Sequence, residues 1–140
     1  ALDGYAAAYG RAYGEQLAAK LGLPDWQAGD ELLVQAWYDW LERARVDLTL
    51  GFRHLSEHAP ESWTPAALAP AAYDAAALDR HGAALIDWRE RYRARLAASG
   101  VDEARRQARM QAVNPVYIPR NWLAQEAIDA AEQGDLAPLQ

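Results

Sequence analysis

Cysteine is absent from the 140 residues of this sequence, so the chain can form neither a disulfide framework nor a thiolate metal site. Valine, isoleucine and threonine are scarce while alanine is abundant, and this composition favours helix over strand. No apolar run approaches the roughly 18 residues of a membrane span, and the start resembles no secretory signal. We therefore expect no membrane partner.

Positive charge is outnumbered by negative charge, because 14 basic residues stand against 20 acidic ones and give a net charge of −6. Lys20 is the one lysine, and the other basic residues are thirteen arginines. A nucleic-acid-binding domain would usually be basic, so we expect no nucleic-acid partner. Residues 1–140 are the size of one domain with one core. Because alanine fills little volume, that core must come from the six tryptophans, seven tyrosines and the leucines. We predict one all-α domain of about five to seven helices, without a sheet.

Apolar residues that recur with helical spacing, together with caps and glycine stops, predict where the helices lie. The longer helices are expected over residues 2–21, 31–45, 47–57, 79–99 and 103–113. The first two are expected to pair antiparallel, with Asp30 as the cap of the second and Asp102 as the cap of the last. On the last helix, the alanines and Met110 are expected to face the core, with Arg105, Arg106 and Arg109 outside.

Residues 59–80 are predicted to be rich in loops, with a helical turn at 65–69 capped by Ser62 or Thr64. Trp63, Leu68 and Tyr73 are expected to hold this segment to the core.

Three tyrosines of the first expected helix, Tyr5, Tyr9 and Tyr13, follow four-residue steps that lead on to Leu17 and Leu21. Such a row could contact a ligand. A face packed inside the protein, with the hydroxyls at its rim, is the interpretation that we favour.

One string has the residue types of a catalytic site: His54, Glu57 and His58 have the H-x-x-E-H spacing of inverzincin metalloproteases. Two histidines one helical turn apart could bind zinc, and the glutamate could act as the general base. Zinc catalysis requires a third protein ligand, and Ala59-Pro60 would end the helix directly after His58. A small zinc metallohydrolase is therefore a minor alternative, and we expect no metal site.

Four arginines, Arg89, Arg91, Arg93 and Arg95, cluster on the helix expected at 79–99. They could bind RNA or phosphate, or contact an acidic surface elsewhere in a longer protein. A solvated face with exchangeable surface ion pairs is favoured, because the domain is acidic overall.

The most organised stretch runs from Asn114 to Asp135. Asn114-Pro115 indicates a turn, Pro119 suits a first helical turn, and Gly134 is a typical helix stop. Between them, apolar residues form a stripe with helical spacing: Leu123, Ala124, Ala127, Ile128 and Ala131.

The same stretch resembles the C-terminal signature of the selenoprotein O family, whose YdiU-like members have a kinase-like fold. The similar residues are Asn114-Pro115, Ile118, the run Arg120 to Ile128, and Gly134-Asp135; Pro119 departs from the pattern, where an aliphatic residue is more usual. Further similarities follow in the family's order: Lys20 to Leu23, Asp47 to Thr49, Phe52 to Leu55, Trp88, Tyr92-Arg93, Arg95-Leu96 and Met110.

The resemblance implies a C-terminal part of a cytoplasmic protein that uses ATP and magnesium to transfer AMP to protein hydroxyls. In that family the nucleotide-binding and catalytic residues lie upstream of the similar region, in the kinase-like core. No catalytic, cofactor-binding or metal-binding residue is therefore assigned within 1–140. A redox-active cysteine or selenocysteine, where the family has one, would lie beyond Gln140.

Because the sequence starts at Ala1 rather than at a methionine, we expect a fragment whose partners are its own kinase-like core and, through the whole protein, protein substrates. Aromatic residues that normally face this core could make the fragment self-associate; the candidates are Trp63, Tyr73, Tyr117 and Trp122. A free-standing helical protein-interaction module is the main alternative.

Overall fold

The computed structural model of the chain describes residues 2–114, and it confirms the all-α fold. The elements in chain order are α1 (Leu2–Lys20), α2 (Asp30–Arg43), α3 (Leu48–Glu57), η1 (Pro60–Ser62), α4 (Pro65–Leu68), η2 (Ala69–Ala71), α5 (Ala75–Arg80), α6 (Gly82–Ser99) and α7 (Glu103–Val113). The described residues form no strand, and their one strand-like pairing is an isolated bridge between Val46 and Ala72. No helix among them is long and apolar enough to cross a membrane.

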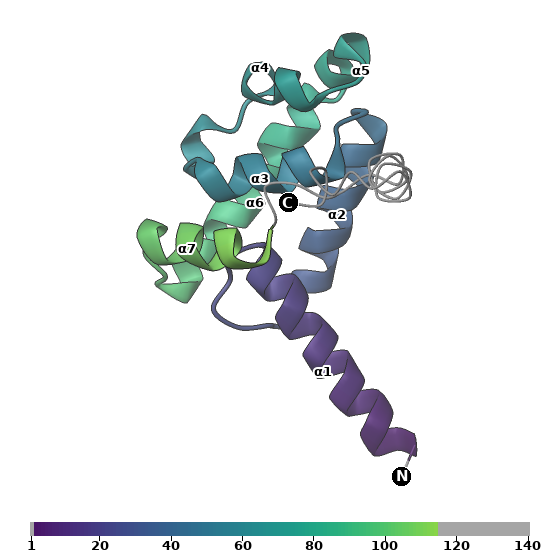
Figure 1. The fold of residues 1–140 in the computed structure, drawn as a ribbon, viewed down its shortest axis with the longest axis vertical. Coiled ribbons are helices and arrows are strands. Elements are labelled where there is room, and N and C mark those ends of the chain that lie inside the picture. Colours follow the sequence, from purple (N-terminus) through teal and green to yellow (C-terminus); the bar gives the residue numbers. More distant parts are fainter. Residues whose placement is uncertain (1, 115–140) are drawn as a thin grey trace, which may run out of the picture.

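The long helix α6 runs through the middle of the molecule, with α2 packed along it and α3 in front of it (Figure 1). Helix α7 packs against both α3 and the C-terminal end of α1. The short elements from η1 to α5 cover the end of the bundle opposite α1 (Figure 1). The rest of α1 projects away from the body toward the N-terminus.

Side-chain caps begin several of the helices. Asp47 accepts a hydrogen bond from the Leu50 amide at 3.0 Å, and Asp102 accepts one from the Arg105 amide at 2.9 Å. Thr64 caps α4 in the same way. Gly100, with a φ of 68°, ends α6 in the left-handed conformation that glycine adopts without strain.

Two local predictions are wrong. Asp30 is the first residue of α2 rather than its cap. Its carboxylate accepts hydrogen bonds from the backbone N–H of Gln27 and from Arg95, and not from the first turn of the helix. The helix expected at 79–99 is observed as α6 and ends at Ser99 as predicted, but it begins at Gly82, because His81 separates it from the short helix α5.

Closely packed aromatic rings fill the core. Trp37 and Trp88 lie 4.6 Å apart between ring centroids, and Trp63 lies 5.1 Å from Tyr92. The indole N–H groups of Trp63 and Trp88 donate to the carbonyls of His58 and Leu33. Trp63 and Trp88 therefore contribute buried apolar area, while the indole N–H that each carries into the core is satisfied.

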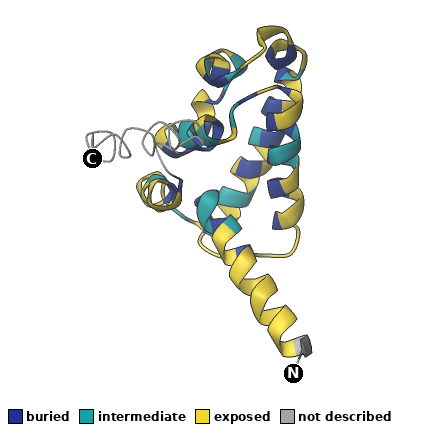
Figure 2. Cartoon of the chain, turned by 45° about the vertical axis from the view of Figure 1, so that its right-hand side comes forward, coloured by how far each residue is buried: buried dark blue, intermediate teal, exposed yellow. Residues whose placement is uncertain are grey.

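The packed tyrosine face predicted for α1 is wrong. Tyr5, Tyr9 and Tyr13 are 72%, 64% and 54% exposed, whereas Leu21 at the other end of the row is buried. Figure 2 shows the change along the helix, from exposed over residues 4–13 to buried where α1 meets the body. The expected antiparallel pair is not formed, because α1 leads away from the bundle and only its last turns reach it, so it does not run alongside α2 (Figure 1).

The four aromatic residues expected to face the kinase-like core of a longer protein divide into three groups. Trp63 is fully buried, so its predicted exposure is wrong, although its predicted role in holding residues 59–80 to the core is confirmed. Tyr73 is exposed, as the same hypothesis requires. Tyr117, Trp122 and the helix predicted after Pro119 lie outside the described residues.

Candidate functional site

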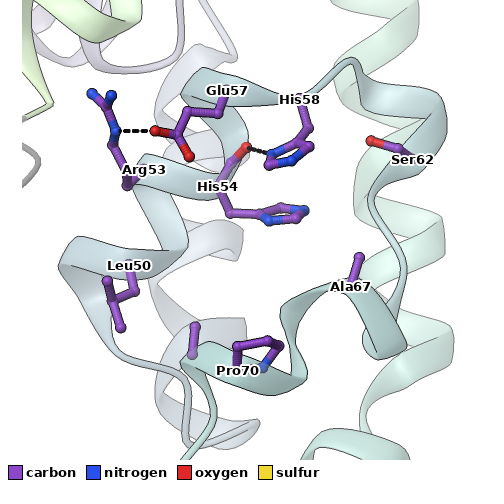
Figure 3. A pocket seen from close by; sticks show the side chains of 9 residues that line it. Leu50, Arg53, His54, Glu57, His58, Ser62, Ala67 and Pro70 are labelled. Atoms are coloured by element: carbon purple, nitrogen blue, oxygen red, sulfur yellow. Dashed lines mark hydrogen bonds and ion pairs between the residues drawn. The ribbon is translucent and has the colours of Figure 1, made fainter.

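A pocket of about 410 Å³ lies where α3 ends, between that helix and the segment from η1 to η2 (Figure 3). Its lining includes all three residues of the H-x-x-E-H string. The full lining is Leu50, Arg53, His54, Glu57, His58, Ser62, Ala67, Pro70 and Ala71. The sequence therefore places its catalytic-looking residues beside a cavity, and their geometry shows what they can do there.

The two histidine rings stack face to face, with centroids 4.3 Å apart and planes 19° from parallel. The lone pair of an imidazole nitrogen lies in the plane of its ring, so two nearly parallel rings do not aim at one ion between them. His58 has left the helix as the residue after α3, and its Nδ1 lies 3.1 Å from the carbonyl oxygen of His54. The arrangement therefore differs from the convergent pair that a zinc site requires.

The glutamate of the string also has a structural partner. Glu57 forms an ion pair with Arg53, with 2.6 Å between the carboxylate oxygen and Nε, as Figure 3 shows. Burial lowers the pKa of His54, and the neighbouring His58 adds to this effect while Glu57 opposes it. Across residues 2–114, no group of three or more histidine and carboxylate side chains is placed to hold a metal ion.

A buried arginine lies at the same end of α3. Arg106 is 1% exposed, and its guanidinium donates to the backbone carbonyls of Leu55 at 3.0 Å and His58 at 2.9 Å. Glu103 holds the other side of the group through two contacts of 2.6 and 2.7 Å. A cation at the C-terminus of a helix both satisfies free carbonyls and opposes the negative end of the helix dipole.

The prediction that Arg106 faces outward is therefore wrong. The buried side of α7 consists of Arg106 and Met110, with Asn114 directly after the helix, whereas Ala104 and Ala108 are exposed. These three buried residues follow four-residue steps, a regularity that the sequence contains. We missed it because arginine was assigned to the solvent side by its charge.

Asn114 joins three helices. Its side-chain amide donates to the carbonyl of Lys20 at 2.9 Å and to the hydroxyl of Ser56 at 3.2 Å, and the residue is buried. Ser56 in turn donates to the carbonyl of Phe52. The first residue of the C-terminal signature thus fixes the end of α7 against α1 and α3.

The arginines of α6 are largely engaged within the domain. Arg95 binds Asp30 at 2.8 Å and Asp25 at 3.0 Å, and the hydrogen bond to Asp30 raises its pKa. Arg89 donates to the Trp63 carbonyl, and Arg93 pairs with Glu61 and Glu90. The favoured interpretation, a face of exchangeable surface pairs, holds for Arg93. It does not hold for Arg95, whose side chain is mostly buried.

Fold and polar contacts together define a helical domain in which the clustered charged and polar groups connect helices to one another. A family model described as "Protein adenylyltransferase SelO" matches residues 1–140, and the chain belongs to that family. Two similar proteins are both described as "Protein nucleotidyltransferase YdiU". The one from an Azoarcus species is 43% identical over 138 residues, and the one from Salmonella arizonae is 43% identical over 139 residues.

Each of these alignments covers 99% of the present chain but 27% of the relative. The chain thus spans about a quarter of the length of the curated relatives that it matches.

Proposed function

We propose that residues 1–140 are the helical C-terminal part of a longer protein nucleotidyltransferase that transfers AMP from ATP to protein hydroxyls. The observation that carries this proposal is the similarity along the whole chain to proteins described as protein nucleotidyltransferases. In the proposal, nucleotide binding and chemistry belong to the kinase-like part of the parent protein, which binds ATP with magnesium. ATP is available in the cytoplasm, so we place the parent protein there.

Within the parent, the proposed role of this region is to support the catalytic part. Two buried polar groups favour a rigid support: Arg106 caps the end of α3, and Asn114 connects α1, α3 and α7. Buried side chains with several satisfied hydrogen bonds hold helices in one arrangement. Such a body could keep its attached surfaces in a fixed position relative to a neighbouring catalytic domain.

The test compares three proteins: the full-length parent, residues 1–140 alone, and the parent without this region. Transfer of AMP to protein is followed by mass spectrometry, with ATP and magnesium present. We expect transfer by the full-length protein, none by residues 1–140, and both lower activity and a lower melting temperature for the shortened parent. AMP transfer by residues 1–140, or undiminished activity and stability of the shortened parent, would contradict the proposal.

The alternative, a free-standing interaction module, makes a different prediction about the coding sequence upstream of residue 1. If the coding sequence upstream of residue 1 contains no kinase-like nucleotide site, the module becomes the better account of the chain.

A further inference from the structure

The first turns of α1 form a regular helix that has almost no tertiary packing. Residues 4–13 are all exposed, and Tyr5, Tyr9 and Tyr13 are each more than half exposed (Figure 2). An isolated helix of this length is marginal in water, since most helical stability in proteins comes from packing of one face. The exposed turns therefore require a partner surface in order to be stable.

The tyrosines form one continuous stripe with the buried part of the same helix. They stand four residues apart, and the rings of Tyr9 and Tyr13 are parallel, with centroids 6.4 Å apart. The next residues in the same steps are Leu17, which packs against the core, and Leu21, which is buried in it. The exposed stripe is thus an extension of the hydrophobic core beyond the edge of the domain.

The stripe is large enough to matter energetically. A fully buried tyrosine removes roughly 150–250 Å² of surface from water, and these three are between half and three quarters exposed, so their exposed surface is on the order of 400 Å². A patch of that size is within the range of the largest patch on a typical monomeric protein, which often marks an interaction site.

The relatives indicate what covers the stripe. They align with 99% of this chain, α1 included, yet nearly three quarters of each relative lies outside the alignment. A surface on the same polypeptide is present at a high effective concentration near the stripe. A separate molecule would have to reach a comparable concentration in solution in order to compete with it. The covering surface should be apolar, with acceptors at its rim, because tyrosine hydroxyls usually find a hydrogen-bond partner when they are buried.

We propose that the α1 face formed by Tyr5, Tyr9 and Tyr13 docks onto the remainder of the parent polypeptide, and that this contact attaches the helical domain to the catalytic part. The proposal rests on the proposed function, since it takes the occupant from the longer parent. It adds the identity of the contact face, which is the stripe of α1 and not the arginine face of α6.

Hydroxyl-radical footprinting with mass spectrometry tests this contact on the full-length parent and on residues 1–140, each at a concentration where sedimentation shows a monomer. Tyr92, which is buried in the domain core, is the reference for full protection. We expect the oxidation rates of the three α1 tyrosines to be about fivefold or more lower in the full-length protein, because side chains at the centre of an interface are almost fully buried.

A pair of variants adds a second readout. Tyr9→Ser should lower the melting temperature of the full-length parent and leave that of residues 1–140 unchanged, because Tyr9 lies largely in solvent in the isolated domain. Tyr9→Phe keeps the apolar ring and should retain most of the docking stability, so it serves as the matched control.

Three outcomes would overturn the proposal. The tyrosines could be equally reactive in both proteins, so that nothing in the parent covers them. They could already be protected in monomeric residues 1–140, so that this chain covers them itself. They could be reactive in the monomeric full-length protein and become protected only at a higher concentration, where it dimerises, so that a second copy is the occupant. AMP transfer is measured on the same samples, and its failure would count against the proposed function without deciding where α1 docks.

Discussion

The hydroxyl of Tyr92 on α6 donates to the backbone carbonyl of Leu21 at a distance of 2.5 Å. This contact joins the central helix to the point where α1 ends, across 71 positions of sequence. Both residues are buried, so the hydrogen bond forms in a water-excluded part of the core. The C-terminal end of α1 is thus held firmly in the core, whereas the turns that carry Tyr5, Tyr9 and Tyr13 project into solvent.

The buried Tyr92 predicts a loss of stability at alkaline pH. Burial raises the pKa of Tyr92 to about 12, with Arg106 acting in the opposite direction, whereas an unfolded tyrosine ionises near pH 10. The folded state therefore holds this proton more tightly. The resulting stability is fully present below about pH 10 and is lost as the pH rises toward 12, by about 2–3 kcal/mol in total.

Urea unfolding between pH 8 and pH 12 measures this effect, and Tyr92→Phe is the control. The variant should be less stable at neutral pH, because the Leu21 carbonyl loses its donor, and its free energy of unfolding should fall less steeply with pH. Equal pH dependence in the variant and the native protein would show that Tyr92 is not responsible.

Arg106 and Arg105 are adjacent arginines with opposite expected effects on stability. Arg106→Ala leaves the Leu55 carbonyl without its donor and the His58 carbonyl with the Trp63 indole alone, and it should cost about 2–4 kcal/mol. Arg105 is 83% exposed on its side chain and pairs with Asp102 at 3.4 Å, so Arg105→Ala should change stability by less than about 0.5 kcal/mol. Denaturant unfolding of both variants compares them, and similar costs would contradict the capping role of Arg106.

Two helical glycines offer a second matched pair. A Cβ at Gly51 would lie 2.6 Å from Cδ2 of Leu41 inside the core, so Gly51→Ala should destabilise the domain by about 1–3 kcal/mol. A Cβ at Gly10 would meet no described atom within 4 Å, so Gly10→Ala should add up to about 1 kcal/mol of helix stability in residues 1–140. Thermal unfolding measures both, and a stabilising Gly51→Ala would show that α3 packs less closely against α2.

Sequence reasoning predicted the elements of this fold well because its main signals are local. The span of α7 matched at both ends, and Asp102 caps it as expected. The ends of α1, α2 and α3 each fell within two residues of the prediction. Caps, glycine stops and the apolar period are properties of a few neighbouring residues, so they are present in the sequence itself.

The environment of individual side chains was harder to predict, since it depends on which helices meet. Periodicity placed Tyr5, Tyr9 and Tyr13 on one face but did not indicate that this face extends beyond the bundle. The charge of Arg106 suggested solvent, whereas the free carbonyls at the end of α3 bring it inside. The H-x-x-E-H string showed two histidines and a glutamate in sequence, but the structure was needed to show that the histidine rings stack.

The H-x-x-E-H string also leads to a prediction about the zinc content of the protein. We expect purified residues 1–140 to contain well under one metal ion per chain, because the stacked rings of His54 and His58 do not converge on one point. Elemental analysis measures this, and a chelator should leave the melting temperature unchanged. A stoichiometric metal that is lost together with the fold, and also lost in a His54→Ala variant, would restore the metallohydrolase hypothesis.

In the proposed function, residues 1–140 support a nucleotidyltransferase without binding its nucleotide. Calorimetric titration of ATP with magnesium into residues 1–140, and in parallel into the full-length parent, tests it most directly. We predict saturable binding by the full-length parent and only the heat of dilution with residues 1–140. Saturable, stoichiometric binding of ATP to residues 1–140 would contradict the account.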